Sequence, residues 1–157
     1  MKIPEGLQDL TAAWLTEALR PTGIVTQVNV ISDDAEGIEA VRGLVGETVR
    51  LNLTYDVGET DAPSSLIAKL SSSNPASRAG FHALKVYERE VRFYERLARQ
   101  IELVTPDCYY SAIDLETGHS VLLLEDLTGG HNANRFEDRS LAEAELAISQ
   151  IAHFHAT

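Results

Sequence analysis

"SLIAKLSSS" (residues 65–73) places one lysine in the middle of an apolar run that ends in serines. A short apolar run bounded by turn residues predicts a buried strand. Lysine and glutamate side chains are seldom fully buried unless they are paired. The stretch therefore predicts that a carboxylate from another element of the fold lies against Lys69, and the origin of that carboxylate bears on what the protein does.

The composition predicts one globular domain in a reducing compartment. The chain has 157 residues, about one domain in length, with 24 acidic and 13 basic residues and a formal net charge of -11. That charge repels nucleic acid, which proteins bind through basic patches. No apolar run approaches the ~20 residues of a membrane span, and the N-terminus lacks a signal-peptide core. The single cysteine, Cys108, excludes an internal disulfide, and we expect it to be a buried, structural thiol. We therefore expect a cytoplasmic protein with no nucleic-acid or membrane partner.

Hydrophobic periodicity predicts three helices and five strands. The helices are expected at 11–20, 81–101 and 140–157, and the strands at 24–31, 47–56, 65–70, 108–114 and 120–125. Apolar and polar residues alternate over 47–56, as in a half-buried strand. Ser140 and Glu143 form a capping box for the last helix, whereas 72–80 is expected as a loop. The order predicts an α+β fold: a five-stranded antiparallel sheet with one long helix between the third and fourth strands.

One charged residue breaks the amphipathic pattern of the long helix expected at 81–101. At 100° per residue the apolar side chains form one broad arc, and Glu90 lies inside it, whereas the basic residues lie opposite. A carboxylate packed unpaired against a sheet is strongly unfavourable. We therefore predict that Lys69 and Glu90 pair between sheet and helix. The alternatives are that both side chains face solvent or that the pair only supports the fold.

Two further stretches are candidates for ligand contacts through the backbone. "GLVG" (residues 43–46) contains Gly43 and Gly46, which have no side chains where the backbone would approach a phosphate, although glycines at a hairpin turn need no ligand. "VLLLEDL" (residues 121–127) leaves its apolar run after Leu124. It looks like a hinge whose backbone binds adenine; the alternative for Glu125 and Asp126 is an exposed, solvated loop.

Six stretches in order along the chain carry a family resemblance. They are "VGETVRLNLTYD", "SLIAKL", "VYEREVRFYERLA", "TPDCYYSAID", "VLLLEDL" and "IAHFHA". Together they resemble the N-terminal lobe of the aminoglycoside phosphotransferase/choline kinase-like superfamily, and within it the ecdysteroid-kinase-like (CHK-type) branch. The set covers nearly the whole chain.

The resemblance implies a lobe that binds ATP as kinases do. It implies that Lys69 contacts the ATP phosphates, that Glu90 holds this lysine, and that residues 124–127 form the adenine hinge. ATP and Mg²⁺ are the implied cofactors and a small-molecule hydroxyl is the implied acceptor. The candidate cofactor-binding residues are Gly43, Gly46, Lys69, Glu90, Leu124, Glu125 and Leu127; no catalytic or metal-ligating residue is assigned.

The chain departs from the family pattern in one respect. Such kinases carry a second lobe with an H-G-D-x-x-x-x-N catalytic loop, and this motif does not occur in the 157 residues. We therefore interpret 1–127 as the nucleotide-binding lobe and 128–157 as the loop after the hinge and the first helix of a missing lobe. The chain is then a fragment or a truncated product, with the metal ligands in the missing lobe.

Two functions follow from these observations. The first is the ATP-binding lobe of a small-molecule phosphotransferase, inactive alone because the catalytic loop is absent. The second is a non-enzymatic protein-interaction module in which the Lys69–Glu90 pair is structural. In either case the apolar face of the last helix is expected to be exposed, so that the chain self-associates.

Overall fold

The sheet organises the described part of the chain, which in this computed structural model comprises residues 1–23, 30–34, 45–56, 62–127 and 140–156. Its strands lie in the order β1-β2-β3-β5-β4, and each neighbouring pair is antiparallel. The strands are β1 (Val30–Asp34), β2 (Gly46–Tyr55), β3 (Ser65–Ser71), β4 (Cys108–Ile113) and β5 (Ser120–Glu125). The expected α+β class and antiparallel pairing are confirmed. Most of the strand expected at 24–31 lies outside the described residues.

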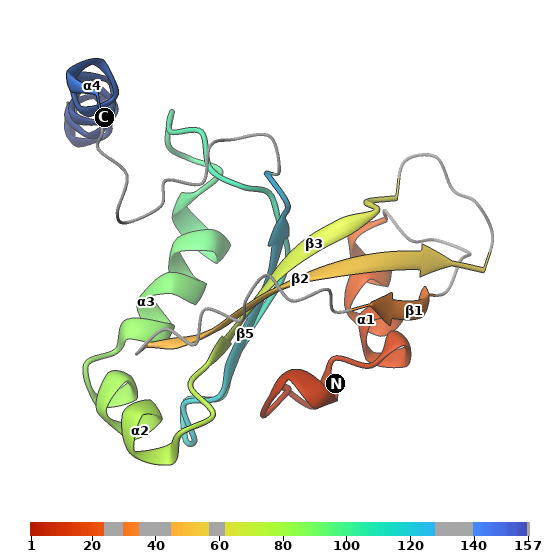
Figure 1. Ribbon diagram of the computed structural model, residues 1–157. Helices are drawn as coiled ribbons and strands as arrows, with labels where there is room; N and C mark the ends of the chain where they lie inside the picture. The colour runs from red at the N-terminus through yellow and green to blue at the C-terminus, as the bar shows by residue number, and fades with distance from the viewer. Residues whose placement is uncertain (24–29, 35–44, 57–61, 128–139, 157) are drawn as a thin grey trace.

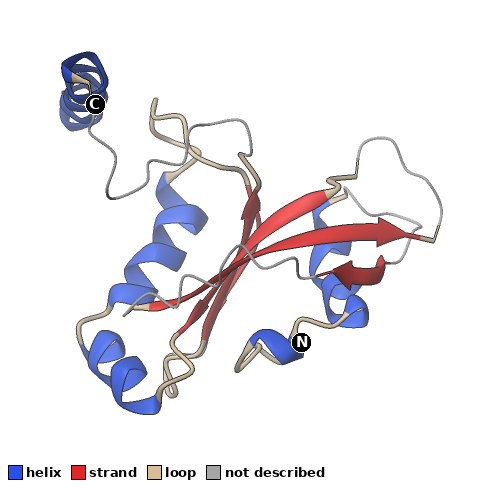
Figure 2. Cartoon of the chain, viewed as in Figure 1, coloured by secondary structure: helices blue, strands red, loops and turns tan. Residues whose placement is uncertain are grey.

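One face of the sheet is covered by the N-terminal helix α1 (Ala12–Leu19), as Figures 1 and 2 show. Thr11 caps this helix by accepting a hydrogen bond from the Trp14 amide at 3.2 Å. The apolar side of α1 packs on alternate residues of β2, β3 and β5. The resulting core consists of Leu10, Leu15, Ala18, Leu19, Val49, Leu51, Leu53, Leu66, Ala68, Leu70, Val121 and Leu123.

The opposite face of the sheet is covered by α3 (Val86–Arg92). Val91 of this helix is buried with Leu122 and Leu124 of β5 in a second, smaller cluster. Because successive strand residues point to opposite faces, β5 contributes to both clusters and is buried on both sides, as central strands are. One face of the described sheet therefore packs against α1, and the other face packs against α3.

The prediction of a single long helix over 81–101 is wrong. The segment forms α2 (Pro75–Ala83), then α3, and then a π-helical turn over Phe93–Leu97. Lys85 separates the two helices with a left-handed φ of 56°, the conformation in which many helices end. The break turns the chain, so a helical wheel drawn through it misplaces residues: Leu84, assigned to the apolar arc, is 64% exposed.

The prediction of a loop over 72–80 is also wrong, because α2 begins at Pro75, inside this range. The Asn74 side chain accepts hydrogen bonds from the amides of Ala76 and Ser77 at 2.9 and 3.1 Å. Pro75 occupies the first helical position, where its missing N–H and fixed φ are favourable. An asparagine cap followed by proline marks a helix start, although this helix is short and its residues are on average only weakly apolar.

The last described helix, α4 (Leu141–Ala156), lies apart from the sheet in Figure 1. Its expected capping box is confirmed: the Glu143 amide donates to Ser140 Oγ at 3.2 Å, and the Ser140 amide donates to the Glu143 carboxylate at 2.9 Å. Several of its apolar side chains are exposed: Leu141, Leu146, Ile148 and Ile151. No helix within the described ranges has the length and apolar character needed to cross a membrane.

Candidate functional site

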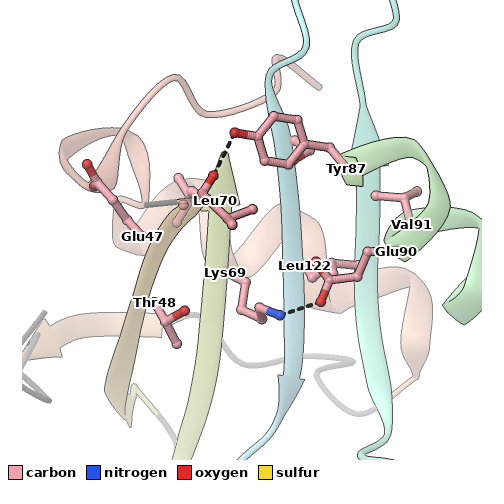
Figure 3. Close-up of a pocket in the computed structure, with 11 residues that line it drawn as sticks. Glu47, Thr48, Lys69, Leu70, Tyr87, Glu90, Val91 and Leu122 are labelled. Carbon is pink, nitrogen blue, oxygen red and sulfur yellow. Dashed lines mark hydrogen bonds and ion pairs between the residues drawn. The ribbon is translucent and has the colours of Figure 1, made fainter. Parts of the chain in front are cut away.

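A cavity of about 180 Å³ lies on the α3 face of the sheet, at the end where β2 begins and β3 ends (Figure 3). Its walls come from β2 and the residue before it, from β3, from α3 and from β5. The lining residues are Val45, Gly46, Glu47, Thr48, Lys69, Leu70, Tyr87, Glu90, Val91, Ser120 and Leu122. Three candidate site residues, Gly46, Lys69 and Glu90, are thus brought together in one cavity.

The Lys69 ammonium pairs with the Glu90 carboxylate in this cavity (Figure 3), which confirms the predicted ion pair. Lys69 lies between Thr48 of β2 and Leu122 of β5 in the sheet register. The pair is less buried than the sequence predicts, since the side chains of Lys69 and Glu90 are 38% and 36% exposed. A cation that is held by a partner and still open to solvent can take an anionic ligand.

The local geometry of α3 explains why Glu90 still faces Lys69, although the predicted long helix is broken at Lys85. Within α3 and the turn after it, Tyr87, Glu90, Val91 and Tyr94 are spaced as i, i+3, i+4 and i+7, so they share one side of the helix. Tyr87 and Val91 are 4% and 1% exposed, and they fix this side against the sheet. The carboxylate between them is therefore directed towards β3.

Tyr87 ties α3 to the ends of two strands. Its hydroxyl donates a hydrogen bond to the Val45 carbonyl at 2.6 Å and accepts one from the Ser72 amide at 3.3 Å. Val45 precedes β2 and Ser72 follows β3, so one side chain joins both strands at the cavity end. The ring also makes an edge contact with Phe81 of α2, with the centroids 6.5 Å apart.

Gly46 is required by strand packing, whether or not a ligand is present. A Cβ atom at this position would overlap the carbonyl oxygen of Leu70 on the neighbouring strand. The close approach of β2 and β3 therefore accounts for one glycine of "GLVG" without a ligand, but the reason is strand packing and not a hairpin turn, because Gly46 is the first residue of β2 and is paired with Ser71. Gly43 lies outside the described residues.

The three candidate hinge residues lie at the other end of β5, away from the cavity lining. Leu124 is buried on the α3 face. Glu125 ends the strand, and its amide donates to the Asp107 carbonyl at 2.8 Å while its carboxylate accepts from the Asp107 amide at 3.1 Å. Leu127 is 53% exposed. The structure thus ties Glu125 to the residue before β4 rather than to the cavity.

Asp126 is not part of an exposed loop, contrary to the alternative considered for it. Its side chain is only 5% exposed and lies 2.8 Å from Arg50 Nε through Oδ2. Arg50 Nη2 donates to the other carboxylate oxygen at 3.3 Å, and the Ser65 hydroxyl donates to Oδ2 at 2.8 Å. A buried carboxylate held from β2 and β3 fixes the backbone that follows β5.

Sequence reasoning missed Thr48, Arg50 and Tyr87, and it missed the pairing of Asp126 with Arg50. The alternation in β2 did place Thr48 and Arg50 on its polar side, but it could not show that this side faces Lys69. The strand register shows it, because Thr48 is paired with Lys69. The aromatic ring of Tyr87 places it among the apolar residues of 81–101, and nothing local indicates that its hydroxyl bridges two strands.

Cys108 lies away from the cavity, in the cluster packed beneath α3. Burial raises the pKa of its thiol to about 11, and its Sγ donates to the Tyr110 carbonyl at 3.4 Å. These contacts fit the structural role expected for it. Within the part of the chain that the structure describes, no group of three or more His, Cys, Asp or Glu side chains is arranged to hold a metal ion.

The chain matches one family model. The model of the ecdysteroid kinase-like family matches residues 43–157, which include β2 to β5, α3 and every residue that lines the cavity. No curated protein and no solved structure matches the chain. A match over most of the sequence establishes the resemblance that the six stretches predicted, and the chain therefore belongs to the ecdysteroid kinase-like family.

Proposed function

We propose that this chain is the ATP-binding lobe of a kinase-like small-molecule phosphotransferase. The family is kinase-like, and such enzymes transfer the γ-phosphoryl group of ATP to an acceptor, here a small-molecule hydroxyl. In this proposal the cavity receives the phosphates, the segment after Leu124 lies beside adenine, and the lobe is inactive alone. The 157 residues contain no H-G-D-x-x-x-x-N catalytic loop.

The observation that carries the proposal is the placement of Lys69. It is the only lysine or arginine among the described residues that line the cavity, and Glu90 holds it from α3. In a chain with a formal charge of -11, long-range attraction cannot gather an anionic nucleotide. A phosphate site must therefore be local, and a lysine held by a carboxylate offers its charge in a fixed position.

The residues of the cavity and of the segment after β5 are compatible with a bound nucleotide. The lysine supplies a donor for phosphate oxygens, and the half-exposed pair leaves its other donors accessible. Mg²⁺, when bound with ATP, neutralises charge on the phosphates. The Asp126 contacts with Arg50 and Ser65 hold the backbone after β5, which supports an adenine-binding role for the segment that ends at Leu127.

Calorimetric titration of the chain with ATP, in the presence and absence of Mg²⁺, tests the proposal. We expect measurable ATP binding that Lys69→Ala weakens about tenfold or more, because a hydrogen bond between charged groups is lost. Glu90→Gln should weaken binding less, since the lysine keeps its charge and loses only its anchor.

Arg89→Gln is the matched control. Arg89 is exposed on α3, one residue before Glu90, so its loss changes the net charge of the chain as Lys69→Ala does without touching the cavity. Equal effects of Arg89→Gln and Lys69→Ala would mean that only overall charge matters. A wild-type chain that binds no ATP, or a Lys69→Ala variant that binds as well as wild type, would refute the assignment.

A second candidate function is a protein-interaction module, and the exposed apolar residues of α4 favour it. In this case the Lys69–Glu90 pair is structural and the helix binds another chain or a second copy. A stable dimer in analytical ultracentrifugation, unaffected by ATP, would support this candidate. Self-association that coexists with ATP binding would leave the phosphotransferase proposal in place.

A further inference from the structure

Tyr87 stands where the next pair of the β2–β3 ladder would form. The last paired residues at this end are Gly46 and Ser71, so a regular antiparallel ladder would next place Val45 opposite Ser72. Instead the Tyr87 hydroxyl lies between them, donating to the Val45 carbonyl at 2.6 Å and accepting from the Ser72 amide at 3.3 Å. A side chain of α3 thus replaces a direct contact between the strands.

Ser72 is held from a second helix as well. Its carbonyl accepts a hydrogen bond from Arg78 Nη1 of α2 at 2.9 Å, and the residue is 8% exposed. Both backbone groups of Ser72 are therefore satisfied by helix side chains and not by β2. Buried backbone groups need partners, so the separation of the two strands at this end is maintained by Tyr87 and Arg78.

The separated strand ends form part of the cavity. Val45, Gly46 and Tyr87 all line it beside Lys69, and Figure 3 shows Tyr87 and Glu90 extending from the same helix towards β3. One helix therefore sets two things: the position of the lysine charge, through Glu90, and the position of the backbone before β2, through Tyr87. A shift of α3 would move both together.

We propose that Tyr87 is a positioning residue that holds the start of β2 away from the end of β3, so that this backbone is placed to contact the phosphates of a nucleotide. The inference rests on the proposed ATP site and goes further by assigning a residue that selects for the phosphate chain. Without the hydroxyl, the Ser72 amide can bond directly to the Val45 carbonyl, which draws β2 towards β3 and narrows the cavity.

The test compares two ligands on the wild-type chain and on Tyr87→Phe by calorimetric titration. ATP carries the phosphate chain and adenosine does not, so the ratio of their dissociation constants isolates the phosphate end. Tyr87→Phe keeps the buried ring and its contact with Phe81 and removes only the hydroxyl. We expect it to weaken ATP binding about fivefold relative to adenosine, because the displaced strand end loses about one hydrogen bond to the phosphates.

Tyr94→Phe is the matched control. Tyr94 lies two turns further along the same side, in the π-helical turn that follows α3, half-buried and outside the cavity lining, so removing its hydroxyl should leave the ratio unchanged. An unchanged ratio in Tyr87→Phe, or an equal loss for both ligands, overturns the inference and leaves the proposed function standing. A wild-type chain that binds no ATP overturns both.

Hydrogen exchange of the Ser72 amide gives a second measurement, which needs no variant if Tyr87→Phe fails to fold. In the wild type, this amide donates to the Tyr87 hydroxyl. ATP bound against the backbone at Val45 should slow its exchange, whereas adenosine should not. Equal exchange with both ligands would contradict the placement of the phosphates at this strand end.

Discussion

Replacing Lys69 with methionine should change stability little, and the exposure of the ion pair sets the magnitude. A fully buried pair that loses one partner costs about 3–5 kcal/mol, because a charge is left without compensation. Here both side chains are more than a third exposed, so solvent screens the pair. It should contribute about 0.2–1 kcal/mol, as exposed pairs do. Lys69→Met should therefore lower the free energy of unfolding by less than about 1 kcal/mol.

Urea denaturation followed by the fluorescence of Trp14, the one tryptophan of the chain, measures this change. Val91→Ala is the reference: Val91 is 1% exposed and follows Glu90 directly on α3. It should lose about 2 kcal/mol, since two buried methyl groups are removed. A loss of 3 kcal/mol or more for Lys69→Met (the buried-pair range, about 3–5 kcal/mol) would show that the pair supports the fold, which refutes the argument from its exposure.

Three further outcomes follow from two residues, Lys85 and Cys108. Lys85→Gly should raise the free energy of unfolding by up to about 1 kcal/mol, because a left-handed φ of 56° is unfavourable for a residue with a Cβ atom; Lys85→Ala, which keeps that strain, should show no gain in the same urea titration. Cys108 should react slowly with a disulfide reagent at pH 8, since burial raises its pKa to about 11 and the thiolate is the reactive form. For the same reason stability should fall as the pH rises from the ordinary pKa of 9.0 towards 11. Rapid labelling of the folded chain at pH 8 would show that the thiol is not buried.

The elements that depend on neighbouring residues could be predicted from the sequence. The alternation over 47–56 predicts β2, because a strand places successive side chains on opposite faces. The apolar run around Lys69 predicts β3. The capping box of α4 is a four-residue pattern and was equally accessible. The Lys69–Glu90 pair was predicted because two charges of opposite sign each broke an apolar pattern on consecutive elements.

The break between α2 and α3 could not be predicted in the same way. Left-handed helix ends are usually marked by glycine or asparagine, and here the position is occupied by Lys85. The start of α2 does carry a local sign, the Asn74–Pro75 pair, but asparagine, proline, serine and glycine are also the residues typical of loops and turns. The apolar periodicity of 81–101 therefore predicts one continuous helix, and only the tertiary structure shows the break at Lys85.

By itself, the sequence determined four of the described strands (β2 to β5), the charged pair and the family to which they point, because these rest on short-range periodicity and on residues that break it. The tertiary structure decided how exposed that pair is, that Asp126 is buried against Arg50, 76 residues away, and that the Tyr87 hydroxyl separates two strands. These features depend on strand register and on the direction in which α3 leaves α2. Both are set by contacts between segments far apart in the chain, which no local pattern encodes.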